Sequence, residues 1–289
     1  MAAFARLANG NAAPRRVITG QGSRLGRTIH GIAYDAQHDE IVVPNALADA
    51  VLVFRGGANG AEAPVRIIQG PHTQLITPHA VSIDAANQEI LVASLTGHSV
   101  SAFAWNAEGD VAPLRLIKGP RTELGHVVGL AVDSVRNLLA VANSEEILIF
   151  NRTDHGDVPP RARIAGPHTG IGDEPWQMQF FAGRLYVAAS NHLHTNLYSG
   201  ATLKPGARAT PEDPWLNPSL GFIGVWRITD HGDVEPEHRL GGPFSGLLHP
   251  TGLALNPAKG EIYVSDSIRN GIFTFLAPEF FPAPAVPPQ

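Results

Sequence analysis

The 289-residue sequence contains no cysteine, so disulfide bonds and thiolate metal ligands are excluded. Charged residues make up only 16% of the chain and the formal net charge is −5, which argues against a nucleic-acid binder with a basic face. Lys and Arg are scattered, without a basic cluster for an anionic membrane, and no apolar run reaches the length of a transmembrane helix. We therefore expect a soluble protein that binds neither nucleic acid nor membrane.

Two classes of short motif are also missing. Residues Met1 to Arg6 lack the apolar core of a secretory signal, so the compartment stays open between the cytoplasm and export with a signal already removed. No glycine-rich phosphate loop occurs, and we expect no nucleotide cofactor.

Glycine and proline are abundant, with 30 and 24 residues, and hydrophobic residues make up 44% of the chain. This composition indicates a sizeable core and a chain that turns often. A Pro-x-Arg-apolar-apolar-x-Gly phrase recurs, each time after a turn that contains glycine. Its copies start at Pro14, Pro64 and Pro113, with looser copies at Pro160 and Pro236. Such self-similarity is typical of a repeat protein.

Each repeat predicts four short strands. A strand of alternating small and apolar residues, such as Gly129 to Asp133, is followed by a second strand such as Glu40 to Val43. The third strand ends in an aromatic residue, and the Pro-x-Arg phrase is the fourth. Small residues in the first strand fit the crowded axis of a propeller, so we predict an all-β fold, a β-propeller of four-stranded blades. The aromatic residues are Phe54, Phe103, Phe150, Trp226 and Phe275.

The repeat resembles the NHL repeat, in which Pro-x-Gly-apolar-Ala-apolar-Asp precedes a Glu-Ile-Tyr-Val strand and an apolar-x-x-Phe strand. Gly252 to Asn256 and Glu261 to Val264 carry this pattern, and the resemblance covers essentially the whole chain. It implies a propeller, usually of six blades. Because five pairs of first and second strands are present, we predict five blades, with six as the alternative.

We predict one propeller domain over residues 1–277, followed by a proline-rich C-terminal tail over residues 278–289. The last repeat lacks its own fourth strand, because Phe275 runs into this tail. Arg16 to Gly20 would supply that strand, so that the N- and C-terminal strands close the ring and remove two sheet edges. Phe4 to Leu7 resembles a third strand.

In a four-stranded meander, the start of the first strand and the end of the second lie on the same rim. Histidines lie just before or at the first strand in four repeats, and polar residues follow the second strands. We predict that they form a pocket for a small-molecule ligand at the mouth of the channel. The predicted metal ligands are His30, His79, His126 and His249, and the predicted substrate-binding residues are Asn45, Ser94, Asn143, Trp176, Gln177, Tyr198 and Asp266.

The fourth repeat is longer than the others by about 27 residues, inserted after its second strand at about residues 190–220. A long loop within a compact repeat is more often functional than idle, so we predict a lid over the pocket. His192 and His194 lie in it and are the predicted catalytic residues.

Three or four imidazoles from separate strands commonly hold Zn, Fe or Cu, and we expect a transition metal of this kind. The resemblance adds that, in the NHL-like peptidyl-α-hydroxyglycine amidating lyases, a Pro-His-x-x-x-x-acid phrase supplies zinc-binding histidines. Pro78 to Asp84 is similar to this phrase, and His30 to Asp35 matches it without the proline. The third equivalent is missing, and His126 and His249 lie two residues before that position. The residues that occupy it are Val128, Trp176 and Thr251.

The predicted function is therefore an enzyme that acts on a small molecule at a lidded, histidine-rich pocket, metal-assisted as a lyase, hydrolase or oxygenase. The alternative is a non-catalytic propeller that binds a protein or glycan partner through its rim, with histidines that only cap strands. A third hypothesis is a lactonase-like hydrolase, with Asp266 and Asn143 around a bound Ca²⁺.

Overall fold

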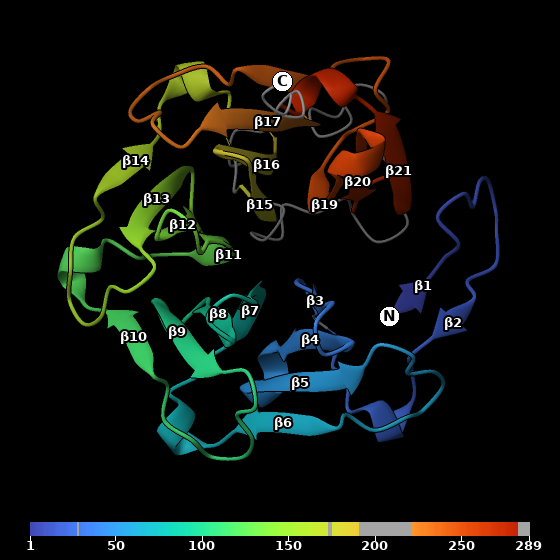
Figure 1. Ribbon diagram of the computed structural model, residues 1–289, viewed down its shortest axis with the longest axis vertical. Helices are drawn as coiled ribbons and strands as arrows, with labels where there is room; N and C mark the ends of the chain where they lie inside the picture. The colour runs from blue at the N-terminus through green and yellow to red at the C-terminus, as the bar shows by residue number, and fades with distance from the viewer. Residues whose placement is uncertain (28, 173–174, 191–220, 283–289) are drawn as a thin grey trace, which may run out of the picture. The chain divides into compact units, whose positions relative to one another are not determined.

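The computed structural model describes residues 1–27, 29–172, 175–190 and 221–282. They form β-strands joined by turns and by single turns of 3-10 helix. Five antiparallel sheets are the blades of a five-bladed β-propeller (Figure 1). The predicted all-β class and the count of five blades are confirmed. Among these residues, no helix has the length and apolarity needed to cross a membrane.

Each sheet is a meander whose strands pair in sequence order, as the repeat predicts. Four sheets have four strands and the last has three. The first sheet contains β3 (Ala33–Asp35), β4 (Glu40–Asn45), β5 (Ala50–Arg55) and β6 (Arg66–Gln69), and the second contains β7 (Pro78–Asp84), β8 (Glu89–Ser94), β9 (Ser99–Ala104) and β10 (Arg115–Lys118). The third contains β11 (Val127–Asp133), β12 (Leu138–Asn143), β13 (Glu146–Asn151) and β14 (Ala162–Ile164). The fourth contains β15 (Met178–Phe181), β16 (Arg184–Ser190), β17 (Gly221–Arg227) and β18 (His238–Gly241), and the fifth contains β19 (Pro250–Asn256), β20 (Glu261–Asp266) and β21 (Gly271–Leu276).

The glycines of the repeated turns have positive φ values. Gly60 and Gly109 have φ values of 62° and 72°, in the left-handed region where a side chain would be strained. The Gly-Pro-x-Thr phrase that follows a fourth strand forms a single 3-10 turn, held in one copy by Thr73 Oγ1, which donates to Gly70 O at 2.6 Å. These phrases are therefore structural turns.

The aromatic residue near the end of each third strand anchors the core of its blade. It lies opposite an apolar residue of the second strand, as Phe103 lies opposite Ile90 and Trp226 opposite Leu185. Phe103 is 1% exposed and Trp226 is 0% exposed, whereas Phe275 in the three-stranded sheet is only half-buried. The shared register makes it clear which positions are equivalent from blade to blade.

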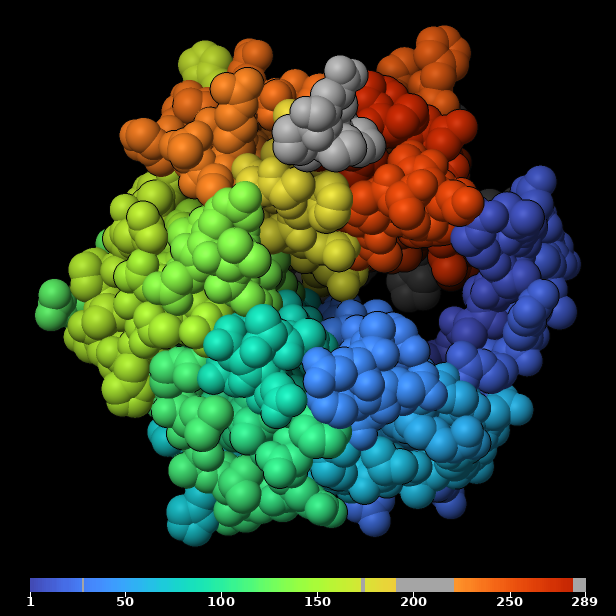
Figure 2. Space-filling model, viewed as in Figure 1, coloured from blue at the N-terminus to red at the C-terminus, as the bar shows by residue number. Residues whose placement is uncertain are grey.

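The chain divides into two compact units. One unit comprises Met1–Val127 with Thr153–Val158, and the other comprises Val128–Arg152 with Pro159–Gln289. In the first unit, β4 packs beside β7, and Figure 2 shows the side chains of these two sheets, coloured blue and cyan to green, in contact with each other. Their shared core includes Val42, Val53 and Phe103.

The N-terminal segment pairs differently from the prediction. Arg16–Val17 form β2, which pairs with β1 (Ala2–Ala3) in a separate two-stranded sheet rather than as a fourth strand of the last sheet. Met1 and Ile18 extend this pairing, since each backbone nitrogen donates to the other's carbonyl oxygen at 2.8 Å. Phe4 to Leu7 is not a strand, because a turn closed by Ala8 N and Ala5 O begins there. Val17 also bonds outside this hairpin, since its backbone N–H donates to Asn59 Oδ1 at 3.0 Å and its carbonyl oxygen accepts the N–H of Gly60 at 2.7 Å.

Small residues in the first strands are needed for close backbone approach, as the sequence predicts. A Cβ added to Gly129 in β11 would lie 1.9 Å from the backbone oxygen of Trp176, which belongs to the same unit. We expect Gly129→Ala to destabilise the protein by about 1–3 kcal/mol, because backbone must move to relieve the clash. The control is Gly271→Ala, whose Cβ would meet its nearest atom at 3.7 Å. Equal urea midpoints for the two variants would contradict this packing.

Candidate functional site

Two of the predicted histidines lie against each other in the first unit. The rings of His30 and His79 are stacked, with centroids 4.2 Å apart and planes 18° from parallel. His30 lies just before β3, and His79 lies in β7. The two histidines therefore come from the first two blades, as the predicted rim requires.

Local backbone features bring these rings together. The pairing of β7 with β8 slips between Pro78 and Ala80, so His79 sits at a β-bulge, which re-aims its side chain. Gly31, next to His30, allows the strands to approach. A Cβ at Gly31 would lie 3.0 Å from Ala80 Cα and 3.1 Å from the His79 carbonyl oxygen. A larger residue there would separate the two histidines.

The two rings have different environments. His79 is 4% exposed, whereas His30 is an exposed residue. Desolvation lowers the pKa of His30 below its ordinary value of 6.5, so its imidazole is neutral at pH 7. A neutral, accessible imidazole on a buried support can accept a proton from a bound molecule.

The stacked geometry of His30 and His79 does not suit the expected transition-metal site. Imidazole nitrogens donate to a metal in the ring plane, and nearly parallel stacked rings do not direct two nitrogens at one point. Among the residues that the structure describes, no group of three His, Asp or Glu side chains is placed to hold a metal ion. The geometry of His30 and His79 thus does not fit a metal ion shared by the two rings.

The polar residues after the second strands are buried and hydrogen-bonded within the fold. Asn45 and Asn143 are each 4% exposed and Ser94 is 0% exposed. Asn45 Nδ2 donates to Arg24 O at 2.8 Å, and Asn143 Nδ2 donates to Glu146 Oε1 at 3.1 Å. Ser94 Oγ accepts the backbone N–H of Ile76 at 3.5 Å. Their visible role is to hold neighbouring loops, and their predicted contact with a substrate stays a prediction.

A second aromatic–histidine contact lies in the other unit. His249 is 5% exposed and meets the edge of Trp176 at a centroid distance of 5.9 Å. Its Nδ1 lies 2.9 Å from Ser267 Oγ. The Asp266 carboxylate accepts four backbone N–H groups, including those of Leu248 and His249 at 2.7 and 2.8 Å, so it organises the loop before β19.

Gln177 also acts inside the second unit, where its Oε1 accepts the backbone N–H of Leu253 at 3.0 Å. His126 is half-buried at the end of the first unit. His192, His194, Tyr198 and most of the predicted lid lie outside the described residues.

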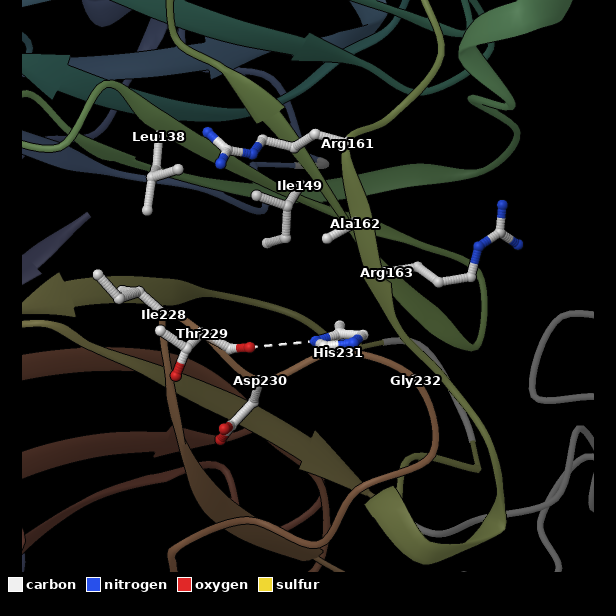
Figure 3. Close-up of a pocket in the computed structure, with 10 residues that line it drawn as sticks. All are labelled: Leu138, Ile149, Arg161, Ala162, Arg163, Ile228, Thr229, Asp230, His231 and Gly232. Carbon is white, nitrogen blue, oxygen red and sulfur yellow. Dashed lines mark hydrogen bonds between the residues drawn. The ribbon is translucent and has the colours of Figure 1, made fainter.

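A groove that the repeat pattern did not single out lies in the second unit, between the third and fourth sheets. It has a volume of about 550 Å³ and is lined by residues of β12, β13, β14 and the turn after β17 (Figure 3). The signal was present in the sequence, because three of its lining residues, Leu138, Ala162 and Ile228, differ from the residues at the equivalent positions of the first two sheets.

Comparison with known proteins does not assign the chain to a family. No model of a known protein family matches the chain, and no curated protein matches it. The function therefore has to be proposed from the residues themselves.

Proposed function

We propose that the protein is an enzyme that acts on a small molecule at the His30–His79 pair, with His30 as the proton acceptor. The stacking of an exposed, neutral imidazole on a buried one carries this proposal. His30 would remove a proton from the substrate or from an attacking water, and His79 would fix the plane of its ring. This chemistry suits a hydrolase or a lyase.

Turnover should depend on His30 and on pH. Since the pKa of His30 is lowered, we expect kcat/KM to rise as the pH increases through a value below 6.5 and then to stay level towards pH 8. His30→Gln should reduce turnover about 100-fold, the lower end of the usual effect of a general base. The measurement is kcat/KM against pH on chromogenic esters, lactones and β-elimination substrates.

The matched control is His72→Gln. His72 is an exposed histidine of the same unit, and its Nδ1 lies 2.7 Å from Asp110 Oδ2 on a repeat turn. We expect this variant to keep wild-type turnover. Full activity in His30→Gln would rule out the proposed base, and a loss of equal size in His72→Gln would assign the effect to folding.

The metal-assisted form of this activity stays a prediction. Elemental analysis of protein purified without a histidine tag decides it. One equivalent of zinc, iron or copper that is lost in His79→Ala would support a metal-assisted reaction. Less than about 0.1 equivalent of metal in active protein would rule it out.

A further inference from the structure

One position between neighbouring blades is filled by a charged network in the first unit. Arg66, at the start of β6, donates from Nη2 to Glu40 Oε2 at 2.7 Å, and Trp105 Nε1 donates to the same oxygen at 2.8 Å. The Arg66 guanidinium lies 5.1 Å from the centre of the Trp105 ring, and the His38 ring stacks on that ring at 3.6 Å. These side chains occupy the space between the first and second sheets.

The strand registers identify the same position in the second unit. Ile41 faces Phe54 and Leu139 faces Phe150, so the preceding residues, Glu40 and Leu138, are equivalent. Arg66 faces Val53 and Ala162 faces Ile149, each one residue before the core aromatic, so Arg66 and Ala162 are equivalent. Ile228 lies two residues after Trp226, as Trp105 lies two residues after Phe103.

All three replacements are uncharged, and Ala162 and Ile228 are also much smaller than Arg66 and Trp105. The groove of about 550 Å³ lies at this position. Leu138, Ile149 and Ile228 supply its apolar surface, and Figure 3 shows them converging from both sides. The groove is thus the space that the ion pair and tryptophan fill elsewhere in the fold. Its volume lies within the range of small-molecule sites, about 300–1,000 Å³.

The wall of the groove is cationic. Arg161 and Arg163 are both exposed, and each uses Nη1 for a partner, Asn151 Oδ1 at 3.0 Å and Glu146 Oε2 at 3.2 Å respectively. The bond from Arg161 to Asn151 uses one of the five donors of its guanidinium, so Arg161 can still donate to a ligand. On the opposite side, His231 Nδ1 lies 3.1 Å from Thr229 O, and Asp230 Oδ2 accepts the backbone N–H of Arg227 at 2.8 Å. Figure 3 shows the Asp230 carboxylate turned away from Arg161.

We propose that this groove binds a small monocarboxylate with an aliphatic body. The aliphatic part lies against Leu138, Ile149 and Ile228, and the carboxylate pairs with Arg161 at the edge. The site belongs to the second unit and does not depend on the histidine pair of the first.

Calorimetric titration with hexanoate, hexan-1-ol and hexylamine tests the chemistry of the ligand. We expect hexanoate to bind with a Kd of about 1 mM or lower, and the alcohol and the amine at least about tenfold more weakly, because only the carboxylate gains the charge-assisted bonds. Arg161→Gln should weaken hexanoate about tenfold and leave hexan-1-ol unchanged. Lys118→Gln, at the end of β10, is the matched loss of a cation elsewhere and should have no effect.

Two filling variants test the location. Leu138→Glu with Ala162→Arg copies the Glu40–Arg66 ion pair of the first sheet, and Ala162→Leu fills the groove with carbon alone. We expect both to reduce hexanoate binding at least tenfold while melting temperature shows that each is folded. If either variant fails to fold, the other gives the result. Absence of hexanoate binding to the wild type at about 20 mM, or wild-type affinity in a folded filling variant, would overturn the proposal.

Discussion

Replacing Phe103 by alanine is expected to lower the free energy of unfolding by about 3–5 kcal/mol. Phe103 is 1% exposed and packs in the core of the first unit with Val92 and Ile90, the residue opposite it in the sheet. Alanine would remove most of the buried ring and leave a cavity that the two strands cannot close, because their backbone hydrogen bonds fix their spacing. Urea unfolding followed by far-UV circular dichroism measures the change.

The repeat supplies the control for this experiment. Phe275 holds the equivalent place opposite Ile262 in the last sheet, but it is half-buried. Phe275→Ala should therefore cost clearly less, about 1–2 kcal/mol, in proportion to the apolar area that it withdraws from water. Equal losses in the two variants would show that the burial of these aromatic rings does not differ between the blades.

Arg66→Ala is expected to destabilise the protein by about 3–5 kcal/mol, because it leaves the Glu40 carboxylate buried without its cation. Glu40 is 8% exposed. Burial raises the pKa of Glu40, but the hydrogen bonds from Arg66 and Trp105 outweigh this effect and hold the pKa below its ordinary value of 4.5. The measurement is again the unfolding free energy, taken at pH 7, where this carboxyl is ionised.

Two comparisons make this result specific. Arg55→Ala breaks a surface pair with Glu62 and should cost clearly less than Arg66→Ala, because Arg55 is largely exposed and solvent screens the pair. Glu40→Leu combined with Arg66→Ala copies the Leu138–Ala162 arrangement of the third sheet and should recover most of the loss, since no unpaired charge remains. A double variant as unstable as Arg66→Ala alone would contradict the assignment of the loss to the buried charge.

Much of the fold could be predicted because its signals are local. Turn glycines such as Gly60 need a positive φ, and each core aromatic, such as Phe103, lies at a fixed place in its repeat. The pairing of the N-terminal residues could not be predicted in the same way. The sequence of Arg16–Val17 fits a fourth strand, but the selection of Ala2–Ala3 as its partner depends on which segment lies nearby.

The sequence predicted where the histidines of the candidate site lie along the chain, but not how their rings are oriented. The repeat placed His30 and His79 before the first strands, but their stacking follows from a bulge at His79 and from the small size of Gly31. Equally, the sequence placed Asp266 at the end of β20 but did not reveal that four backbone N–H groups occupy its carboxylate. Hydrogen-bond partners of this kind depend on loop conformation, which residue spacing does not encode.

The groove in the second unit could not be predicted from the sequence, because the equivalent positions of the repeats are known only from the strand registers in the structure. Leu138 and Ala162 look like ordinary apolar residues until they are compared with Glu40 and Arg66. A repeat position that loses both members of an ion pair creates space, and the cavity confirms that neighbouring side chains do not refill it.

The most direct test of the proposed site is an NMR titration of the imidazole rings in protein with isotope-labelled histidine. We predict that His30 titrates below 6.5 and that His79→Ala, which uncovers one face of the ring, moves its midpoint upward towards the ordinary value. His72→Gln should leave the midpoint of His30 unchanged. Titration of His30 at or above 6.5 in the wild type, with no response to His79→Ala, would contradict the neutral stacked pair on which the proposed function rests.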